Sequence, residues 1–195
     1  MKKILVVLLA FTLALPVMAQ EDAKSSSVLT SIAQTQRQNA AKAQKYHFKQ
    51  TKHSPMLVGD AVRTGYMVVG PQKHMEWHYT DTADFALIME GEKCFMLKDG
   101  KKSPVKGRSG RMASRLAAMM MELADGGGLM DGKQFESSLA ETSAAWVVTL
   151  DPRKRDLKRV MQKVVLTFDK QTLRIQSVKI VEDKDSFTQI DFEKK

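Results

Sequence analysis

The chain has a single cysteine, Cys94, among its 195 residues. One thiol cannot close an intramolecular disulfide, so a framework of cross-links is excluded and the fold must depend on its hydrophobic core. Cys94 lies in the run KCFMLK, which is typical of a strand. We expect it to act there as a small buried apolar side chain.

Recognisable catalytic motifs are also missing. The sequence has no G-x-S-x-G elbow, no phosphate-binding loop and no dinucleotide fingerprint. Its four histidines fall within residues 47–78, but the string HMEWH has its glutamate one position too late for a zinc-protease helix and is typical of a strand. We therefore expect no enzyme, no cofactor and no metal site.

Only one long apolar run is present, and it stands near the N-terminus. Two lysines precede residues 4–15, which are too few to span a bilayer comfortably, and V-M-A at 17–19 resembles a signal-peptide cleavage site. An uncleaved anchor is disfavoured because the run is short. The predicted division is a signal peptide at 1–19, a flexible N-terminus at 20–27 and a single domain at 28–195.

Positive charge is in excess, with a formal net charge of +9 that falls by two when the predicted signal is removed. For an exported protein this excludes nucleic acid and favours anionic lipid head groups or an acidic partner, although lysines also simply keep a protein in solution. The strongest basic cluster follows Asp151 and is either a docking surface or a solvated turn. Its residues are Arg153, Lys154, Arg155, Lys158 and Arg159.

Residues 46–97 are typical of short strands joined by turns, which predicts an antiparallel meander. In residues 74–80, alternation puts Met75, Trp77 and Tyr79 on one face and the two histidines and Glu76 on the other. The apolar residues are unusually large and soft, which favours a surface that adapts to a variable apolar guest. They are Phe48, Met67, Val69, Met75, Trp77, Phe85, Leu87, Met89, Phe95 and Met96.

Two helices are predicted, at residues 28–45 with Ser26 or Ser27 as the cap and at 111–124 with Ser109 as the cap. The second carries an apolar stripe that is either core or a lid over a cavity, formed by Met112, Leu116, Met119, Met120 and Leu123. The glycine-rich loop at 125–133 is predicted to be the most flexible internal segment and to mark a hinge or a lid boundary. Residues 134–145 stay ambiguous between helix and strand.

Strand patterns return after residue 145, so the order is helix, about five strands, helix and about four strands. This order predicts the α+β class, with one large antiparallel sheet and few helices. A sheet of this size tends to curl, and helices on its concave face would leave it an incomplete barrel rather than a filled sandwich.

Several segments resemble the LolA-like carriers of outer-membrane lipoproteins. They are FKQ in the first strand, G-Y-M-V-V-G-P-x-K-x-M-x-W-x-Y in the next two, F-x-L-I-x-x-G, W-V-V-T-L-D-P-R-K-R, V-L-T-F-D-K, V-K-I-V-E and F-T-Q-I-D-F. The resemblance covers roughly residues 28–192. It implies a curved, incomplete antiparallel β-barrel with helices covering a concave hydrophobic cavity.

The resemblance also implies a function: a monomeric periplasmic carrier that holds the acyl chains of a lipoprotein or lipid without covalent catalysis. The implied partners are an inner-membrane donor transporter and an outer-membrane acceptor, with peripheral membrane contact. The candidate lipid-binding residues are the strand residues given above other than Phe95, together with Leu116, Met119 and Met120.

One position departs from the family. Many members carry an arginine before the proline of the second turn, where it ties down a helical lid, but here Gly70 precedes Pro71. Any latch must therefore be built differently. The alternative function is a sensor or regulator that uses the same fold to detect envelope lipids.

Overall fold

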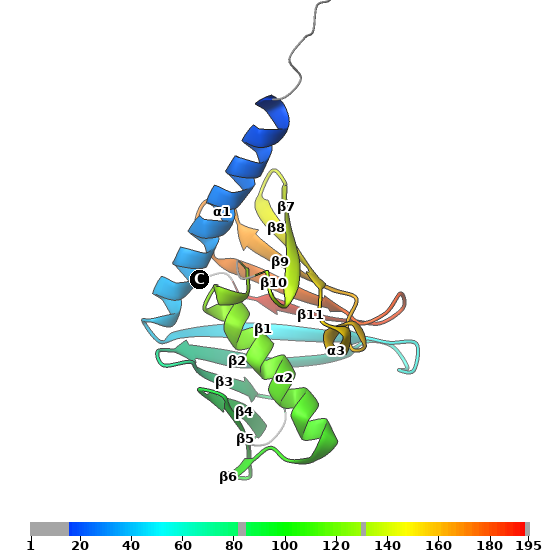
Figure 1. Cartoon of the computed structure of the whole chain (residues 1–195). Coiled ribbons are helices and arrows are strands. Elements are labelled where there is room, and N and C mark those ends of the chain that lie inside the picture. Colours follow the sequence, from blue (N-terminus) through cyan, green and yellow to red (C-terminus); the bar gives the residue numbers. More distant parts are fainter. Residues whose placement is uncertain (1–15, 82–84, 130–131, 194–195) are drawn as a thin grey trace, which may run out of the picture.

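The protein is described by a computed structural model that covers residues 16–81, 85–129 and 132–193 (Figure 1). Most of the predicted signal peptide, residues 1–15, lies outside the described residues. Within the described ranges, no helix is long and apolar enough to cross a membrane.

One helix precedes the first group of strands. The elements of this half are α1 (Pro16–Ala40), β1 (Gln44–His53), β2 (Ala61–Gly70), β3 (His74–Tyr79), β4 (Phe85–Glu90), β5 (Lys93–Lys98) and β6 (Lys101–Pro104). The second half consists of α2 (Gly107–Ala124), the 3-10 turn η1 (Gly127–Leu129), β7 (Phe135–Glu141), β8 (Ala145–Pro152), α3 (Arg155–Lys158), β9 (Lys163–Asp169), β10 (Ile175–Val181) and β11 (Phe187–Phe192).

All eleven strands among the described residues form one antiparallel sheet in the order β6-β5-β4-β3-β2-β1-β11-β10-β9-β8-β7. Two meanders, β1–β6 and β7–β11, are joined where β1 pairs with β11. The sheet does not close, because its outer strands β6 and β7 are not paired with each other. The predicted α+β class and incomplete antiparallel barrel are confirmed.

Both long helices lie over one face of the curved sheet (Figure 1). α2 crosses the first meander and contacts β4 and β5, while α1 contacts β2, α2 and η1. Alternation along the strands directs Met75 and Trp77 to this face, where they are buried, as predicted. The core beneath the helices is rich in methionine, a flexible side chain that fills irregular spaces. Its buried methionines are Met67, Met75, Met89, Met119, Met120, Met121 and Met161.

The N-terminal helix is longer than predicted at its start and shorter at its end. It begins at Pro16, so residues 20–27 are helical rather than flexible, because no glycine or second proline interrupts the run. Ser27 is therefore no cap, and its hydroxyl donates to the carbonyl oxygen of Lys24 at 2.9 Å. The helix ends at Ala40, and Ala43, at φ 53°, turns the chain into β1.

Three other elements add to or differ from the predictions. α2 begins at Gly107, so Ser109 lies inside the helix, and Lys106 occupies the N-cap position. β6 was not expected, since its sequence KKSP is polar and carries no alternation. Residues 135–141 form a strand, which resolves the ambiguous segment in favour of β structure.

The predicted hinge is packed where the structure describes it. Gly126, at φ +73°, lies so close to α1 that a Cβ there would stand 2.5 Å from the carbonyl oxygen of Ala33. Gly128 and Leu129 are buried in η1. The glycine-rich segment thus joins α2 tightly to α1, which corrects the expectation of a loose loop over these residues. Residues 130–131 lie outside the described ranges.

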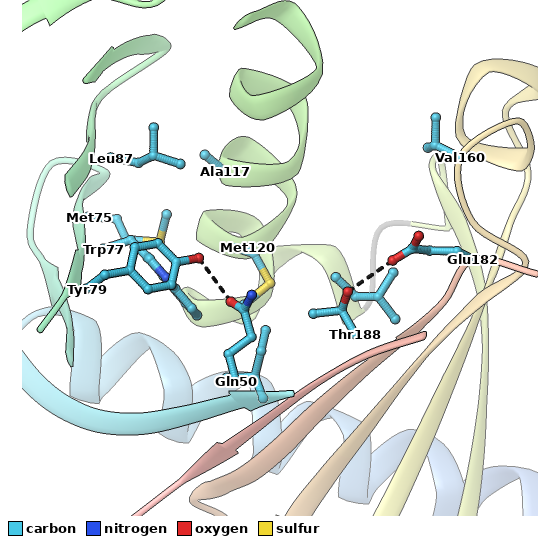
Figure 2. Close-up of a pocket in the computed structure, with 12 residues that line it drawn as sticks. Gln50, Met75, Trp77, Tyr79, Leu87, Ala117, Met120, Val160, Glu182 and Thr188 are labelled. Atoms are coloured by element: carbon cyan, nitrogen blue, oxygen red, sulfur yellow. Dashed lines mark hydrogen bonds between the residues drawn. The ribbon is translucent and has the colours of Figure 1, made fainter. Parts of the chain in front are cut away.

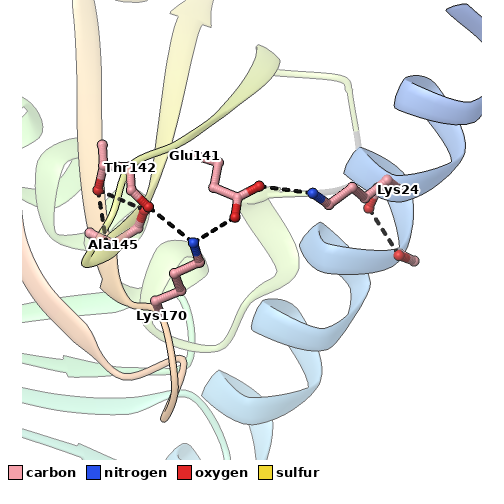
Figure 3. A network of polar contacts seen from close by, with 6 residues as sticks. Lys24, Glu141, Thr142, Ala145 and Lys170 are labelled. Carbon is pink, nitrogen blue, oxygen red and sulfur yellow. Dashed lines mark hydrogen bonds and ion pairs between the residues drawn. The ribbon is translucent and has the colours of Figure 1, made fainter. Parts of the chain in front are cut away.

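A second contact attaches α1 to the far part of the sheet (Figure 3). The carboxylate of Glu141 on β7 accepts from Lys170 at 2.6 Å and from Lys24 at 2.8 Å. Both ammonium groups also lie within 6 Å of the ring centre of Trp146. Hydrogen bonds from Lys170 and Lys24 lower the pKa of Glu141 to about 2.

We predict that the contribution of Glu141 to stability depends on pH. The folded pKa lies below the unfolded value of 4.5, so the contribution is complete above about pH 4.5 and is lost as pH falls toward 2. Thermal melts of the wild type and Glu141→Gln at several pH values should show a small difference in Tm that is constant near neutrality and vanishes in acid. Added salt should shrink it at neutral pH. A difference independent of pH would assign Glu141 a packing role instead.

Gly65 on β2 permits the closest aromatic contact of the concave face. A Cβ at this position would stand 1.9 Å from the carbonyl oxygen of His78 and 2.7 Å from Cζ of Phe48. The ring of Phe48 lies above this gap and packs on Trp77 with 4.3 Å between ring centres. The absence of a side chain therefore places Phe48 against the floor of the sheet.

Replacing this glycine should cost stability. We predict that Gly65→Ala lowers the free energy of unfolding by about 1–3 kcal/mol, the usual range for an overpacked core, because the clash involves the backbone. Urea unfolding measures it. The matched control is Gly70→Ala on the same strand, where the nearest atom to an added Cβ is 3.7 Å away. An equal loss in both variants would contradict the steric explanation.

Candidate functional site: an apolar cavity under α2

A cavity of about 520 Å3 lies between the concave face of the sheet and α2 (Figure 2). Most of its lining is apolar. The lining residues are Gln50, Met75, Trp77, Tyr79, Leu87, Ala117, Met120, Val160, Ile180, Glu182, Thr188 and Ile190. A volume of about 300–1,000 Å3 is typical of small-molecule sites.

The cavity exists because α2 covers the sheet without filling the space below it. Ala117 faces the cavity with only a methyl group, whereas Met119, Met121 and Leu123 are buried in the core without lining it. Met120 lines this cavity and also a smaller space of about 20 Å3 between α1, α2 and the sheet. The methionine therefore separates two adjoining spaces.

Polar groups of the lining are paired with one another (Figure 2). The hydroxyl of Tyr79 donates to Oε1 of Gln50 at 3.0 Å. The hydroxyl of Thr188 donates to Oε1 of Glu182 at 3.0 Å, and the same oxygen accepts from Lys52. Burial raises the pKa of Tyr79, so its hydroxyl stays a donor at neutral pH. These pairs satisfy the hydroxyl groups of Tyr79 and Thr188, whereas the buried indole N–H of Trp77, which also lines the cavity, has no hydrogen-bond partner among the described residues.

The predicted lipid-binding residues divide into three groups. Four of them line the cavity: Met75, Trp77, Leu87 and Met120. The residues buried in the core without lining it are Phe48, Met67, Val69, Met89 and Met119, of which Met67 and Val69 border the smaller space. Phe85 and Met96 are half-buried on the same face by register but do not line it, and the side chain of Leu116 lies outside the described residues.

Phe95 belongs to the opposite face. It pairs with Ile88 and Pro104, one position out of step with Met96, and the ammonium of Lys102 lies 4.4 Å from its ring centre. Strand alternation explains this correction, because adjacent residues point to opposite faces.

The second meander supplies cavity residues that sequence reasoning missed. Ile180, Thr188 and Ile190 come from β10 and β11, and Val160 comes from the connection between α3 and β9. Ile190 and Thr188 pair with Gln50 and Lys52 of β1 and so share its face, a pairing that only the structure reveals.

Gly70 stands before Pro71, where the resemblance led us to expect an arginine that ties down the helix. Two other polar contacts are made by α2. Arg115 lies 3.3 Å from the carboxylate of Asp156 in α3, and Glu122 accepts from the side-chain amide of Gln134 at 2.5 Å. Gly70 borders only a shallow surface hollow at the β2–β3 turn. The helix thus contacts the second half of the chain at two points, of which the exposed Arg115–Asp156 pair is the weaker.

The basic cluster surrounds a short helix rather than a plain turn. Leu157 buries its side chain and anchors α3, while Arg153 lies 3.6 Å from Glu136. The five basic residues are exposed, and the segment leads directly to Val160 at the cavity.

The histidines on β3 hydrogen-bond to a carboxylate on the convex face. Glu76 lies 2.9 Å from Nε2 of His74 and 2.7 Å from Nε2 of His78, and these bonds lower its pKa, that from His78 most strongly. The ring of His78 stacks on Tyr66 at 4.5 Å. In the part of the chain that the structure describes, no group of three or more metal-binding side chains is arranged to hold an ion.

The fold and the cavity together define a class of protein: an open antiparallel half-barrel whose helices cover an apolar chamber. Residues 39–195 match the family described as "Outer membrane lipoprotein carrier protein LolA", and the chain belongs to this family. The resemblance found in the sequence is confirmed. No curated protein matches the chain significantly.

Solved structures align at low identity. A LolA superfamily protein from Nitrosomonas europaea gives a TM-score of 0.37 at 10% identity over 83% of this chain and 91% of that chain. A putative outer membrane lipoprotein-sorting protein domain from Vibrio parahaemolyticus gives a TM-score of 0.44 at 8% identity. The alignment covers 88% of this chain and 91% of that chain. MucB of Pseudomonas aeruginosa, solved with MucA, gives a TM-score of 0.41 at 13% identity. The alignment covers 87% of this chain and 55% of that chain. The family assignment rests on the family match.

If the space under α2 is empty, filling it should be tolerated. We predict that Ala117→Leu changes the free energy of unfolding by less than about 1 kcal/mol, because the larger side chain enters the cavity without displacing neighbours. Ala86 on β4, which is fully buried and does not line the cavity, is the matched control. Ala86→Leu should cost about 1–3 kcal/mol in the same urea titration. Equal costs would show that the cavity is closed in solution.

Proposed function

We propose that this protein is a periplasmic carrier that holds the acyl chains of a lipoprotein or lipid in the cavity under α2. It takes them from an inner-membrane donor and transfers them toward an outer-membrane acceptor. The observation that carries this proposal is the apolar cavity of about 520 Å3 between the sheet and α2. Membership of a family named for lipoprotein carriers supports it.

The energetics of such a site suit reversible carriage. Each buried methylene contributes about 0.8 kcal/mol, so an acyl chain gains several kcal/mol from the cavity. The cost of immobilising the ligand offsets part of this gain, which leaves an affinity that an acceptor can overcome. The proposed carriage involves no covalent step, because burial of the acyl chain alone supplies the binding free energy.

The soft lining suits guests of varied shape. Met75 and Met120 contact the cavity from opposite sides, one on the sheet and one on the helix. Unbranched thioether side chains change rotamer at little cost, so one cavity can fit chains that differ in length or branching.

Docking is the proposed role of the basic segment 153–159. Its exposed charges flank the connection that ends at Val160. Attraction of such charges to anionic head groups or to an acidic partner is screened over about 8 Å at physiological ionic strength, so delivery should weaken with salt while acyl-chain affinity does not.

The length of bound chains provides the test. We predict that Met120→Ala joins the two spaces that this residue separates and shifts the bound acyl chains toward longer ones, at a cost of about 2–5 kcal/mol in stability. Native mass spectrometry of protein loaded from a mixture of fatty acids measures the distribution.

The matched control is Met121→Ala on the adjacent position. Met121 is also buried but borders neither space, so its loss should cost similar stability and leave the chain-length distribution unchanged. Identical distributions in all three proteins would contradict the assignment of the cavity, and the absence of bound acyl chains would contradict the function. Transfer of the loaded chain to acceptor vesicles separates a carrier from a lipid sensor.

A further inference from the structure

The hairpin between β1 and β2 presents apolar side chains to solvent. Met56 is 94% exposed, Val58 110%, Val62 50% and Leu57 42%. These four are the exposed large hydrophobic residues of the described ranges, and all of them lie in one hairpin. Such a concentration at one tip marks a contact surface, because scattered single exposures are ordinary but clusters are not.

The tip is held in shape rather than loose. The two strands stay paired up to Lys52 and Ala61, and His53 Nδ1 lies 2.6 Å from Oδ1 of Asp60 across the base of the turn. The ring of His53 also stacks on Phe187 of β11 at 5.1 Å. The hairpin projects beyond the body of the sheet (Figure 1). Its apolar tip is therefore displayed on a rigid base.

A separate hollow along this hairpin, which we call the groove, shares one lining residue with the cavity. A second hollow of about 360 Å3 follows the hairpin and is lined by Gln50, Lys52, Ser54, Met56, Leu57, Ala61 and Arg63. Gln50 lines both this hollow and the cavity under α2. Along the hairpin from Gln50, this hollow passes Lys52 and Ser54 before it reaches Met56 and Leu57.

Positive charge surrounds the same route. Lys52 and Arg63 line the groove itself. The basic segment 153–159 leads to Val160, which lines the cavity together with Gln50. An apolar tip combined with basic side chains suits an anionic lipid surface, where buried apolar area and attraction to head groups add.

We propose that the tip of this hairpin, residues 54–60, inserts into the interface of an anionic lipid bilayer and aligns the groove with it. The inference deepens the carrier function proposed above and rests on it for the purpose of the contact. A few apolar residues at a turn bury too little area for a stable dimer, which needs more than about 1,000 Å2, but they suffice for a reversible interfacial contact.

An environment-sensitive fluorophore at the tip tests this directly. Val58→Cys in a Cys94→Ala background carries the label, and Lys184→Cys in the same background is the control at the tip of the neighbouring β10–β11 hairpin, where the side chain is 88% exposed. The probes are vesicles of phosphatidylethanolamine with phosphatidylglycerol and vesicles of phosphatidylcholine alone. We expect a blue shift and quenching by brominated lipid at position 58, stronger with the anionic vesicles, and neither at position 184.

A second variant measures the contribution of the tip. Val58→Ser combined with Val62→Ser should weaken vesicle binding by about tenfold or more, since two exposed apolar side chains of the hairpin are lost, neither of which lines the groove. Its affinity for a soluble fatty-acid probe should match the wild type. If the wild type binds no fatty acid, the proposed carrier function is wrong, but the proposed insertion of the hairpin into vesicles is still tested by the vesicle measurements.

Three outcomes overturn the proposal. They are equal fluorescence changes at positions 58 and 184, unchanged vesicle binding of the double variant, and a shift at position 58 that follows protein concentration without vesicles. The last would assign the tip to a second copy of the chain.

Discussion

The packing of α2 on the first meander is the constraint on which the rest of the structure depends. The helix must shield the concave face from water and yet stand far enough from it to leave a chamber. Its spacing is set mainly at the C-terminal end, where Gly126 allows close approach to Ala33, and the exposed ion pair between Arg115 and Asp156 adds a weak contact near the other end. The methionines beneath it fill the core around the chamber, and Ala117 leaves the chamber open.

The chamber under α2 lies next to the hollow along the β1–β2 hairpin, so the two can be followed as one route. Tyr79 and Gln50 bound the apolar chamber on one side, and Gln50 also begins the groove along the β1–β2 hairpin. Lys52 in that groove pairs with Glu182, which lines the chamber. The route from the chamber to the hairpin therefore passes from apolar walls through paired polar groups to an apolar tip. In the proposed membrane contact, the apolar tip enters the bilayer interface and the polar groups behind it lie at the level of the head groups.

Much of the fold was predictable because it rests on alternation. Residues 74–79 show the period of two that placed Met75 and Trp77 on the buried face, and the turns at Gly70-Pro71 and Asp99-Gly100 fixed the meander. Strand β6 was not predicted, because its edge position requires no apolar face and its sequence therefore shows no alternation. The part of α1 before residue 28 was not predicted to be helical, because its polar composition indicates that the segment is exposed but does not indicate its backbone conformation.

The site was less predictable than the fold, for a geometric reason. Met75 and Met89 face each other in adjacent strands with the same pattern, yet only Met75 lines the chamber. The difference is set by where α2 crosses the sheet, which no local pattern encodes. The contributions of Ile180 and Ile190 likewise depend on the pairing of β1 with β11, which joins residues about 140 positions apart, as Gln50 and Ile190 do.

The most direct measurement of the central claim is methyl NMR of protein with 13C-labelled methionine methyl groups and a bound protonated fatty acid. Met75 and Met120 line the chamber, whereas Met161 is buried outside it. The account predicts intermolecular NOEs from the acyl chain to the methyl groups of Met75 and Met120 and none to that of Met161. NOEs confined to the exposed Met56, or absent from both chamber methionines, would contradict it.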